Sequence, residues 1–142
     1  MYKGLIIHGP NLNKLGRRSQ THYGSLTMDG INHLLTEAFP NVSFVFFQSN
    51  HEGEIIDYLQ RDENYDFVVM NPGGLAHYSI ALRDAFELVC AKKAIVHLSD
   101  IEKRESFRQT DLFKDLADVY FKGLKEYSYV FAIKELIEKH LQ

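Results

Sequence analysis

The chain has 142 residues, with 16 Lys or Arg against 19 Asp or Glu, so its formal net charge at pH 7 is −3. This length predicts a single domain at residues 1–142, and 45% hydrophobic residues suffice for a core without a disulfide or a structural metal. The lone Cys90, and the absence of an apolar run of about 18 residues, predict a cytoplasmic protein. Because Lys and Arg are dispersed, the composition favours a small-molecule partner over nucleic acid or a membrane.

Patterns typical of strands and helices alternate from the start of the chain. Residues 4–8 predict a buried strand, and the polar segment 9–24 that follows is long for a connection to a helix. A helix is predicted over 28–38, where apolar residues recur at helical spacing and Thr27 is placed to cap the first turn. The β-branched and aromatic run 42–48 predicts the second strand.

The alternation continues to the last residues. The remaining elements are predicted, in order, as a short helix at 54–59, a strand at 67–70, a helix at 80–89, strands at 94–98 and 119–121, and a helix at 127–141. Five strand–helix repeats predict an α/β fold, a three-layer flavodoxin-like sandwich with a five-stranded parallel sheet. Ligands of such sheets bind beyond the carboxyl ends of the strands, so the loops that begin there should form the site.

The first of these loops carries Asn11, Arg17, Arg18 and Tyr23. It could be a plain turn, with solvated arginines and a tyrosine packed on the next helix. Alternatively, Tyr23 is a base. A tyrosine hydroxyl ordinarily ionises near pH ~10, so ionising it at neutrality costs about 4 kcal/mol. One cation about 4 Å away supplies that much at an effective dielectric of ~20, and Arg17 or Arg18 could be that cation.

Two later loops carry further candidates. Asn71 begins a Pro-Gly-Gly turn that ends near His77, and His97 ends the fourth strand, either as a structural histidine or as the acid that protonates a leaving group. His77 and Asp84 lie seven residues apart, or roughly 10 Å along a helix axis, so one small substrate would not touch both. Asp84 is therefore either a surface charge or a residue that reaches a neighbouring subunit.

Four ordered motifs, spread over most of the chain, resemble type II 3-dehydroquinate dehydratase, a flavodoxin-like enzyme of the shikimate and quinate pathways. They are Gly9-Pro10-Asn11-Leu12-Asn13 with Arg18 and Tyr23-Gly24, Gln48-Ser49-Asn50-His51-Glu52-Gly53, Asn71-Pro72-Gly73-Gly74 with His77 and Ala81-Leu82-Arg83-Asp84, and His97-Leu98-Ser99 with Arg104-Glu105-x-Phe107-Arg108. The resemblance implies a hydro-lyase that converts 3-dehydroquinate to 3-dehydroshikimate by anti-elimination through an enolate, without metal or cofactor. A biosynthetic and a catabolic role are both compatible with it.

The resemblance also implies a role for each matching residue. Tyr23, as tyrosinate, would remove the C2 proton, and Arg18 would hold its charge and close the lid. Asn11 would order a water against the enolate, and His97 would protonate the departing hydroxyl. The substrate-binding residues would be Asn71, His77, Leu98, Ser99 and Arg108. In the family an aspartate in the position of Asp84 reaches the adjacent site of a trimer, and four trimers form a dodecamer, so a homo-oligomer of this kind is expected.

Ile95 departs from the family pattern, which usually has a glutamate two residues before the catalytic histidine to orient the imidazole. Asp100 and Glu102 are the nearby acids that could replace it. If nothing replaces it, the alternative is a non-catalytic or weakly active small-molecule-binding paralogue on the same scaffold. A flavodoxin or a receiver domain fits the fold alone, but the first loop lacks a Ser/Thr-rich phosphate cradle, and His8 and Asn71 end strands where an acidic phosphorylation site would be needed.

Overall fold

The computed structural model describes residues 1–141 and contains one five-stranded sheet in which every neighbouring pair is parallel, in the order β2-β1-β3-β4-β5. The strands are β1 Tyr2–His8, β2 Val42–Gln48, β3 Phe67–Asn71, β4 Lys92–His97 and β5 Val119–Lys122. The α-helices are α1 Gln20–Tyr23, α2 Met28–Ala38, α3 Glu52–Leu59, α4 Ile80–Glu87 and α5 Tyr127–Glu135. Short 3-10 turns and a π-helical turn complete the described chain, at Leu12–Lys14, Gly73–His77, Ile101–Lys103, Ser106–Arg108, Lys114–Leu116 and Leu136–His140.

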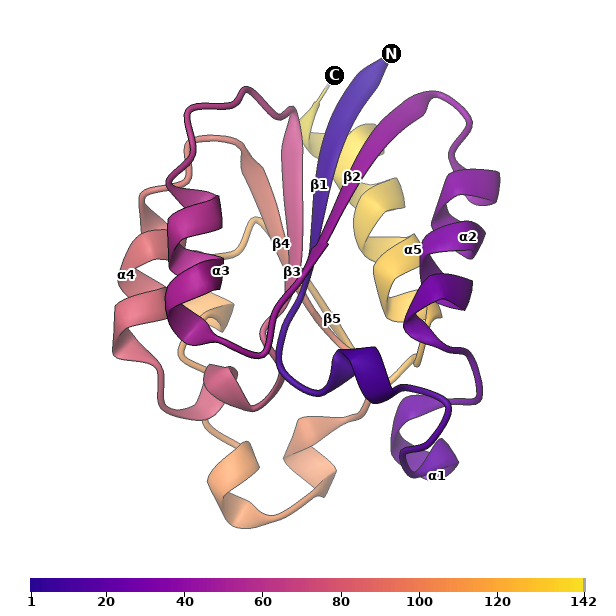
Figure 1. The fold of residues 1–142 in the computed structure, drawn as a ribbon, viewed down its shortest axis with the longest axis vertical. Helices are drawn as coiled ribbons and strands as arrows, with labels where there is room; N and C mark the ends of the chain where they lie inside the picture. Colours follow the sequence, from indigo (N-terminus) through magenta and orange to yellow (C-terminus); the bar gives the residue numbers. More distant parts are fainter. Residues whose placement is uncertain (142) are drawn as a thin grey trace.

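Helices cover both faces of the sheet, with α3 and α4 on one face and α2 and α5 on the other (Figure 1). Successive residues of β1 point to opposite faces, so Leu5 and Ile7 join the core under α3 and α4, whereas Ile6 joins the core under α2 and α5. All five residues of β3 are buried, as expected for a central parallel strand. The predicted three-layer sandwich is therefore confirmed.

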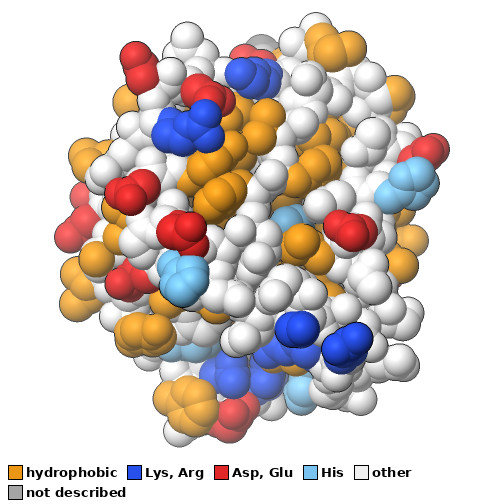
Figure 2. Space-filling model, in the orientation of Figure 1, with side chains coloured by type: hydrophobic (Ala, Val, Ile, Leu, Met, Phe, Trp, Pro, Cys, Tyr) orange, Lys and Arg blue, Asp and Glu red, His pale blue; other side chains and the backbone are white. Residues whose placement is uncertain are grey.

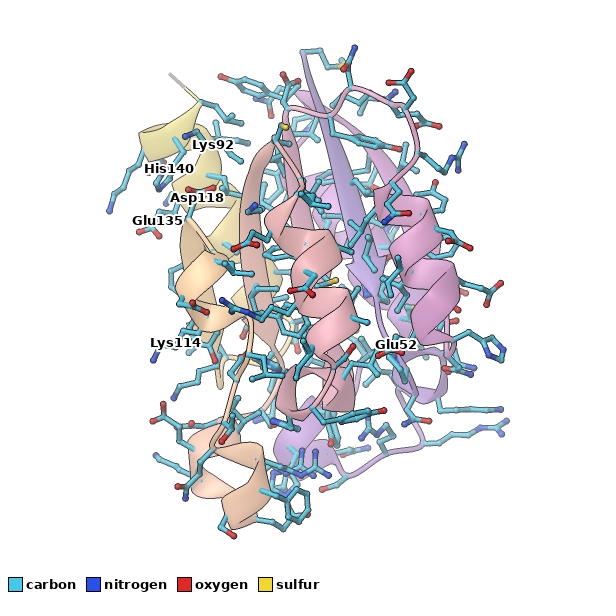
Figure 3. All side chains as sticks on the ribbon, turned by 90° about the vertical axis from the view of Figure 1, so that its left-hand side faces the viewer. Glu52, Lys92, Lys114, Asp118, Glu135 and His140 are labelled. Carbon is cyan, nitrogen blue, oxygen red and sulfur yellow. The ribbon has the colours of Figure 1, made fainter. Side chains whose placement is uncertain are left out.

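Polar side chains fix where the helices begin. Thr27 accepts a hydrogen bond from the Gly30 N–H at 3.0 Å, which confirms the predicted cap of α2. Ser79 caps α4 by accepting from the Leu82 N–H, and its hydroxyl donates to Glu52 at the start of α3. Figure 3 shows Glu52 at the end of the sheet where the strands finish. The starts of the two helices are thus tied together beside that end.

The predicted alternation is wrong in one connection. The link between β4 and β5 contains three 3-10 turns and no α-helix, so the fourth strand–helix repeat lacks its helix. The long polar segment 9–24, predicted only as an unusually long connection, contains a 3-10 turn and the four-residue helix α1. Both segments lie at the carboxyl ends of the strands, at the bottom of Figure 1. Within residues 1–141 no helix combines the length and apolar character that crossing a membrane requires.

Candidate active site

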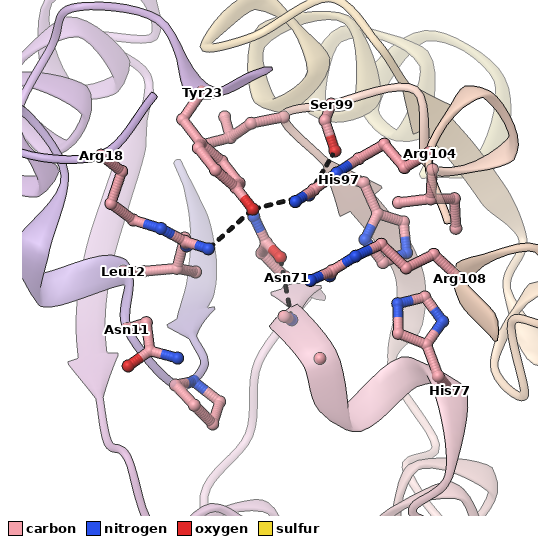
Figure 4. A pocket seen from close by; sticks show the side chains of 15 residues that line it. Asn11, Leu12, Arg18, Tyr23, Asn71, His77, His97, Ser99, Arg104 and Arg108 are labelled. Atoms are coloured by element: carbon pink, nitrogen blue, oxygen red, sulfur yellow. Dashed lines mark hydrogen bonds between the residues drawn. The ribbon is translucent and has the colours of Figure 1, made fainter. Parts of the chain in front are cut away.

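A cavity of about 120 Å³ opens at the carboxyl ends of β1, β3 and β4, between the segment after β1 and the turns after β4 (Figure 4). Its size suits a small molecule. Nine of the ten residues predicted from the sequence line it, namely Asn11, Arg18, Tyr23, Asn71, His77, His97, Leu98, Ser99 and Arg108. The exception is Asp84, which is exposed on α4 and does not line the cavity.

Two arginines hold the hydroxyl of Tyr23. Arg18 Nη2 and Arg104 Nη1 each donate to Tyr23 Oη at 2.6 Å, and they approach it from opposite sides in Figure 4. The Arg18 guanidinium also lies 3.7 Å from the centroid of the tyrosine ring. Two charge-assisted hydrogen bonds on one oxygen are the contacts that a negatively charged oxygen would need. Arg17, the other candidate cation, is exposed and does not line the cavity.

Arg104 was not among the residues chosen from the sequence, although its motif with Arg108 was recognised. Its side chain is 12% exposed, and its Nε is buried without a hydrogen-bond partner in the described part of the chain. Burial, together with the charges of Arg104 and Arg108, lowers the pKa of the Arg18 guanidinium, although Tyr23 opposes the shift. None of the described residues that line the cavity is acidic. The cavity is therefore suited to an anion, and Figure 2 shows Lys and Arg gathered at this end of the molecule.

His97 ends β4 at the wall of the cavity, and its imidazole is held by a carboxylate that the sequence did not reveal. His97 Nε2 and Asp111 Oδ2 are 2.7 Å apart, and both side chains are nearly buried. Asp100 and Glu102, the nearby acids that could have replaced the missing glutamate, instead face Lys122, at 2.7 and 3.6 Å. Neither acid takes that role, because the turn at 101–103 directs them toward β5.

Asn71 forms part of the cavity floor at the end of β3. Its side-chain oxygen accepts from the Gly73 N–H at 3.1 Å, which fixes the amide across the turn. Gly9 lies against the same turn, because a Cβ on it would be 2.8 Å from the Asn71 carbonyl oxygen. Position 9 therefore requires a glycine, because the backbone after β1 and the backbone of this turn lie too close for a side chain between them.

A buried histidine supports this floor from below. His8 Nε2 donates to Asn32 Oδ1 at 2.7 Å, so its Nδ1 accepts from the Tyr129 hydroxyl at 2.8 Å. Burial lowers the pKa of His8 to about 4, against the smaller opposing effect of the bond to Asn32. A hydrogen bond with Asn71 opposes the rise that burial causes in the pKa of Tyr129. The neutral His8 thus joins α2 and α5 to the floor of the cavity.

His77 and Asn11 lie at the mouth of the cavity. His77 Nδ1 donates to the Thr110 carbonyl oxygen at 2.7 Å, which leaves Nε2 as the nitrogen that accepts a hydrogen bond. Asn11 has a φ of 71°, and its backbone N–H donates to Asn50 Oδ1 at 2.9 Å. Within residues 1–141 no group of three or more His, Cys, Asp or Glu side chains is arranged to hold a metal ion.

A parallel α/β sheet whose strand ends present a tyrosine held by two cations and a histidine held by a carboxylate defines an acid–base enzyme for a small anionic substrate. Comparisons with known proteins identify the family. The sequence profile described as "Dehydroquinase class II" matches residues 2–137. The chain belongs to that family.

Named relatives and solved structures agree with this assignment. The 3-dehydroquinate dehydratase of Roseiflexus castenholzii is 46% identical over 138 residues, which cover 95% of this chain and 88% of that protein. The enzyme of the same name from Chlorobaculum tepidum is 44% identical over 94% of this chain and 92% of its own length. The crystal structure of the type II dehydroquinase from Butyrivibrio crossotus superposes with a TM-score of 0.92 at 37% identity, covering 96% of this chain and 98% of that one.

Proposed function

We propose that this protein is a hydro-lyase that dehydrates 3-dehydroquinate to 3-dehydroshikimate, as the names of its relatives indicate for them. The observation that carries the proposal is the convergence of Arg18 and Arg104 on Tyr23 in a cavity that also holds His97. One group suited to be a base and one suited to be an acid therefore face the same small volume.

Tyr23, as tyrosinate, takes the C2 proton, and the electron pair of the C2–H bond moves into an enolate with the C3 carbonyl. Asn11 orders a water against the enolate oxygen. When the enolate collapses, the C1=C2 bond forms and the C1–O bond breaks, and His97 gives a proton to the departing hydroxyl so that it leaves as water. Proton exchange with solvent then restores both residues.

The remaining residues of the cavity bind and orient the substrate. Asn71, His77 and Ser99 supply polar contacts for its hydroxyls, and Leu98 lies beside them at the end of β4. Arg108 is the cation for the carboxylate, because the other two guanidinium groups already donate to Tyr23. The alternative of a non-catalytic binding paralogue depended on Ile95, and the contact of His97 with Asp111 removes that reason.

The protein is also proposed to act as a single-domain homo-oligomer, a dodecamer built from four trimers, in which Asp84 completes a neighbouring site. Asp84 is exposed and lies outside the cavity of its own chain. Apolar side chains of the same region are exposed as well, with Tyr78 at 69%, Ile80 at 65% and Leu88 at 72%. Such a surface suits contact with a second copy. The lone, exposed Cys90 suits a cytoplasmic location.

The Tyr23→Phe variant tests the base, because it keeps the ring between the arginines and removes only the hydroxyl. Formation of the conjugated enone, followed by its absorbance on purified protein, should fall by about 10²- to 10⁴-fold. Tyr127→Phe, at a half-exposed tyrosine outside the cavity, is the matched control and should retain full activity. A wild-type protein without turnover would refute the proposed reaction, whereas an active Tyr23→Phe variant would refute only the identity of the base.

A further inference from the structure

Asp111 is held by contacts on both of its carboxylate oxygens. Oδ2 accepts from the Tyr120 hydroxyl at 2.9 Å and lies 2.7 Å from His97 Nε2, and Oδ1 accepts from the Phe113 N–H at 2.9 Å. The Asp111 side chain is only 4% exposed. A carboxylate placed in this way has little freedom to turn away from the imidazole.

The segment that carries Asp111 is itself anchored. The Leu112 N–H donates to the Ala76 carbonyl oxygen at 2.8 Å, and the Phe113 side chain is completely buried against Phe86. These contacts tie the segment after β4 to the core under α3 and α4. The position of the carboxylate is therefore fixed by the fold rather than by the bond to His97 alone.

The strand of His97 itself offers no orienting acid. Residues 95 and 97 share one face of β4, and residue 95 is a completely buried isoleucine in the core under α3 and α4. Asp100 pairs with Lys122 and caps the following turn. Asp111 is thus the carboxylate that the described chain places on the imidazole.

We propose that Asp111 is the positioning residue for His97, holding its proton on Nε2 so that Nδ1 is the nitrogen that exchanges a proton with the substrate. The inference deepens the proposed function, since it assumes that His97 is the acid of that reaction. A carboxylate accepts only, so Nε2 must donate to Asp111. Because His97 lines the cavity, Nδ1 is the atom left to face a bound molecule. The carboxylate also stabilises the imidazolium that must form before the proton is given up.

The state of Asp111 is consistent with this role. Burial alone would raise the pKa of the Asp111 carboxyl, but the hydrogen bond and charge of His97, with the donors Phe113 and Tyr120, hold the pKa below its usual value. Burial and the nearby Asp111 carboxylate raise the pKa of the Tyr120 hydroxyl, so it keeps its proton and donates. The carboxylate therefore stays ionised beside the imidazole at neutral pH.

Other titratable groups surround the imidazole, and the test must separate their effects from that of Asp111. They are Tyr23, His77, Arg104 and Arg108, which line the same cavity, Tyr120 and Lys122 on the neighbouring strand β5, and Asp100, which pairs with Lys122. The arginines and Lys122 place positive charge near the imidazole, whereas Asp111 places a negative charge on it. Removing Asp111 while the cations remain should therefore change the charge balance at the imidazole, and the pH profile of kcat reports that change.

The decisive variant is Asp111→Asn, which keeps the size of the side chain and an oxygen that accepts from Nε2 but loses the charge. Its kcat should fall by about 10- to 100-fold while KM changes little, and the alkaline limb of its kcat profile should move to lower pH by roughly 1 to 3 units. Asp115→Asn is the matched control, because Asp115 lies in the same segment, pairs with Arg83 on the surface and does not contact His97. It should keep the wild-type profile.

Nitrogen NMR of labelled histidines provides a readout that does not need turnover. The wild type should show His97 protonated on Nε2, and Asp111→Ala should lose this tautomer preference while its other histidine signals report an intact fold. A variant Asp111→Asn with wild-type kcat and pH profile would overturn the proposal, and so would an unchanged His97 tautomer in Asp111→Ala. If the wild type does not turn over 3-dehydroquinate, the proposed function fails, and the NMR result still decides whether Asp111 fixes the imidazole.

Discussion

Arg104→Gln removes one of the two cations on Tyr23 while keeping a side chain of similar length that can donate a hydrogen bond. Ionising a tyrosine at pH 7 costs about 4 kcal/mol. Each guanidinium donates to Tyr23 Oη at 2.6 Å, and a unit charge about 4 Å away contributes about 4 kcal/mol at an effective dielectric of ~20. One cation therefore offsets only the cost of ionising the tyrosine. The second cation also offsets the hydration that the tyrosinate loses inside the cavity.

Loss of Arg104 should accordingly lower kcat at pH 7 by about 10²- to 10³-fold, which is roughly 3 to 4 kcal/mol. The ratio of wild-type to variant kcat should then narrow about tenfold for each unit of rising pH, because hydroxide ionises the tyrosine when the cation is absent. Arg17→Gln, at an exposed arginine outside the cavity, is the control and should leave kcat unchanged.

A double-mutant cycle with Tyr23→Phe tests whether Arg104 acts through the tyrosine. If it does, adding Arg104→Gln to Tyr23→Phe should cost almost nothing further. The electrostatic reasoning would be refuted if the losses of kcat in the two single variants added in full in the double variant. It would also be refuted if the loss of kcat in Arg104→Gln stayed the same as the pH rises.

Three further predictions concern stability and assembly. Burial lowers the pKa of His8 from 6.5 to about 4, so near pH 5 the imidazole is protonated in the unfolded chain but not in the native protein. Between pH 7 and pH 5 the free energy of unfolding of the wild type should therefore fall by about 2 kcal/mol more than that of His8→Gln. Urea titrations of both proteins at both pH values measure the free energy of unfolding. An equal fall in that free energy for the wild type and His8→Gln would contradict the prediction. Gly9→Ala should lower the free energy of unfolding by about 1 to 3 kcal/mol and raise KM, because the new Cβ would clash with the Asn71 carbonyl oxygen. Gly53→Ala, which has open space around it, should change neither quantity. Asp84→Asn and Tyr23→Phe subunits, refolded together, should regain activity that neither has alone; mixtures that stay inactive would place Asp84 outside the neighbouring site.

The sequence predicted where the cavity would lie, because the fold brings the ends of parallel strands to one edge. Asn71 and His97 end adjacent strands, and strand periodicity alone was sufficient to place them there. Tyr23 and Arg18 follow β1 in a segment whose length had no other explanation. Alternating apolar runs thus located the loops that line the cavity, whereas the role expected of each residue came from the family resemblance.

The acid partner of His97 could not be found in the same way. Asp111 follows His97 by fourteen residues, in a connection of 3-10 turns that has no hydrophobic periodicity, and the chain has 19 acidic residues from which to choose. Nearness in sequence favoured Asp100 and Glu102, but a hydrogen bond depends on where the turn directs each side chain. Irregular connections are set by such local contacts, so their side-chain partners are visible only in three dimensions.

The arrangement of the three cavity arginines separates ionisation of the base from recognition of the substrate. Arg18 and Arg104 both donate to Tyr23, whereas the Nε of Arg108 donates to Glu105 at 3.0 Å and its guanidinium belongs to the cavity lining. Binding a carboxylate at Arg108 would therefore leave the tyrosinate contacts intact. If the substrate carboxylate bound Arg104 instead, Tyr23 would lose one of its two cations and with it part of its strength as a base. The geometry therefore favours Arg108 as the group that sets KM and Arg104 as a group that sets kcat.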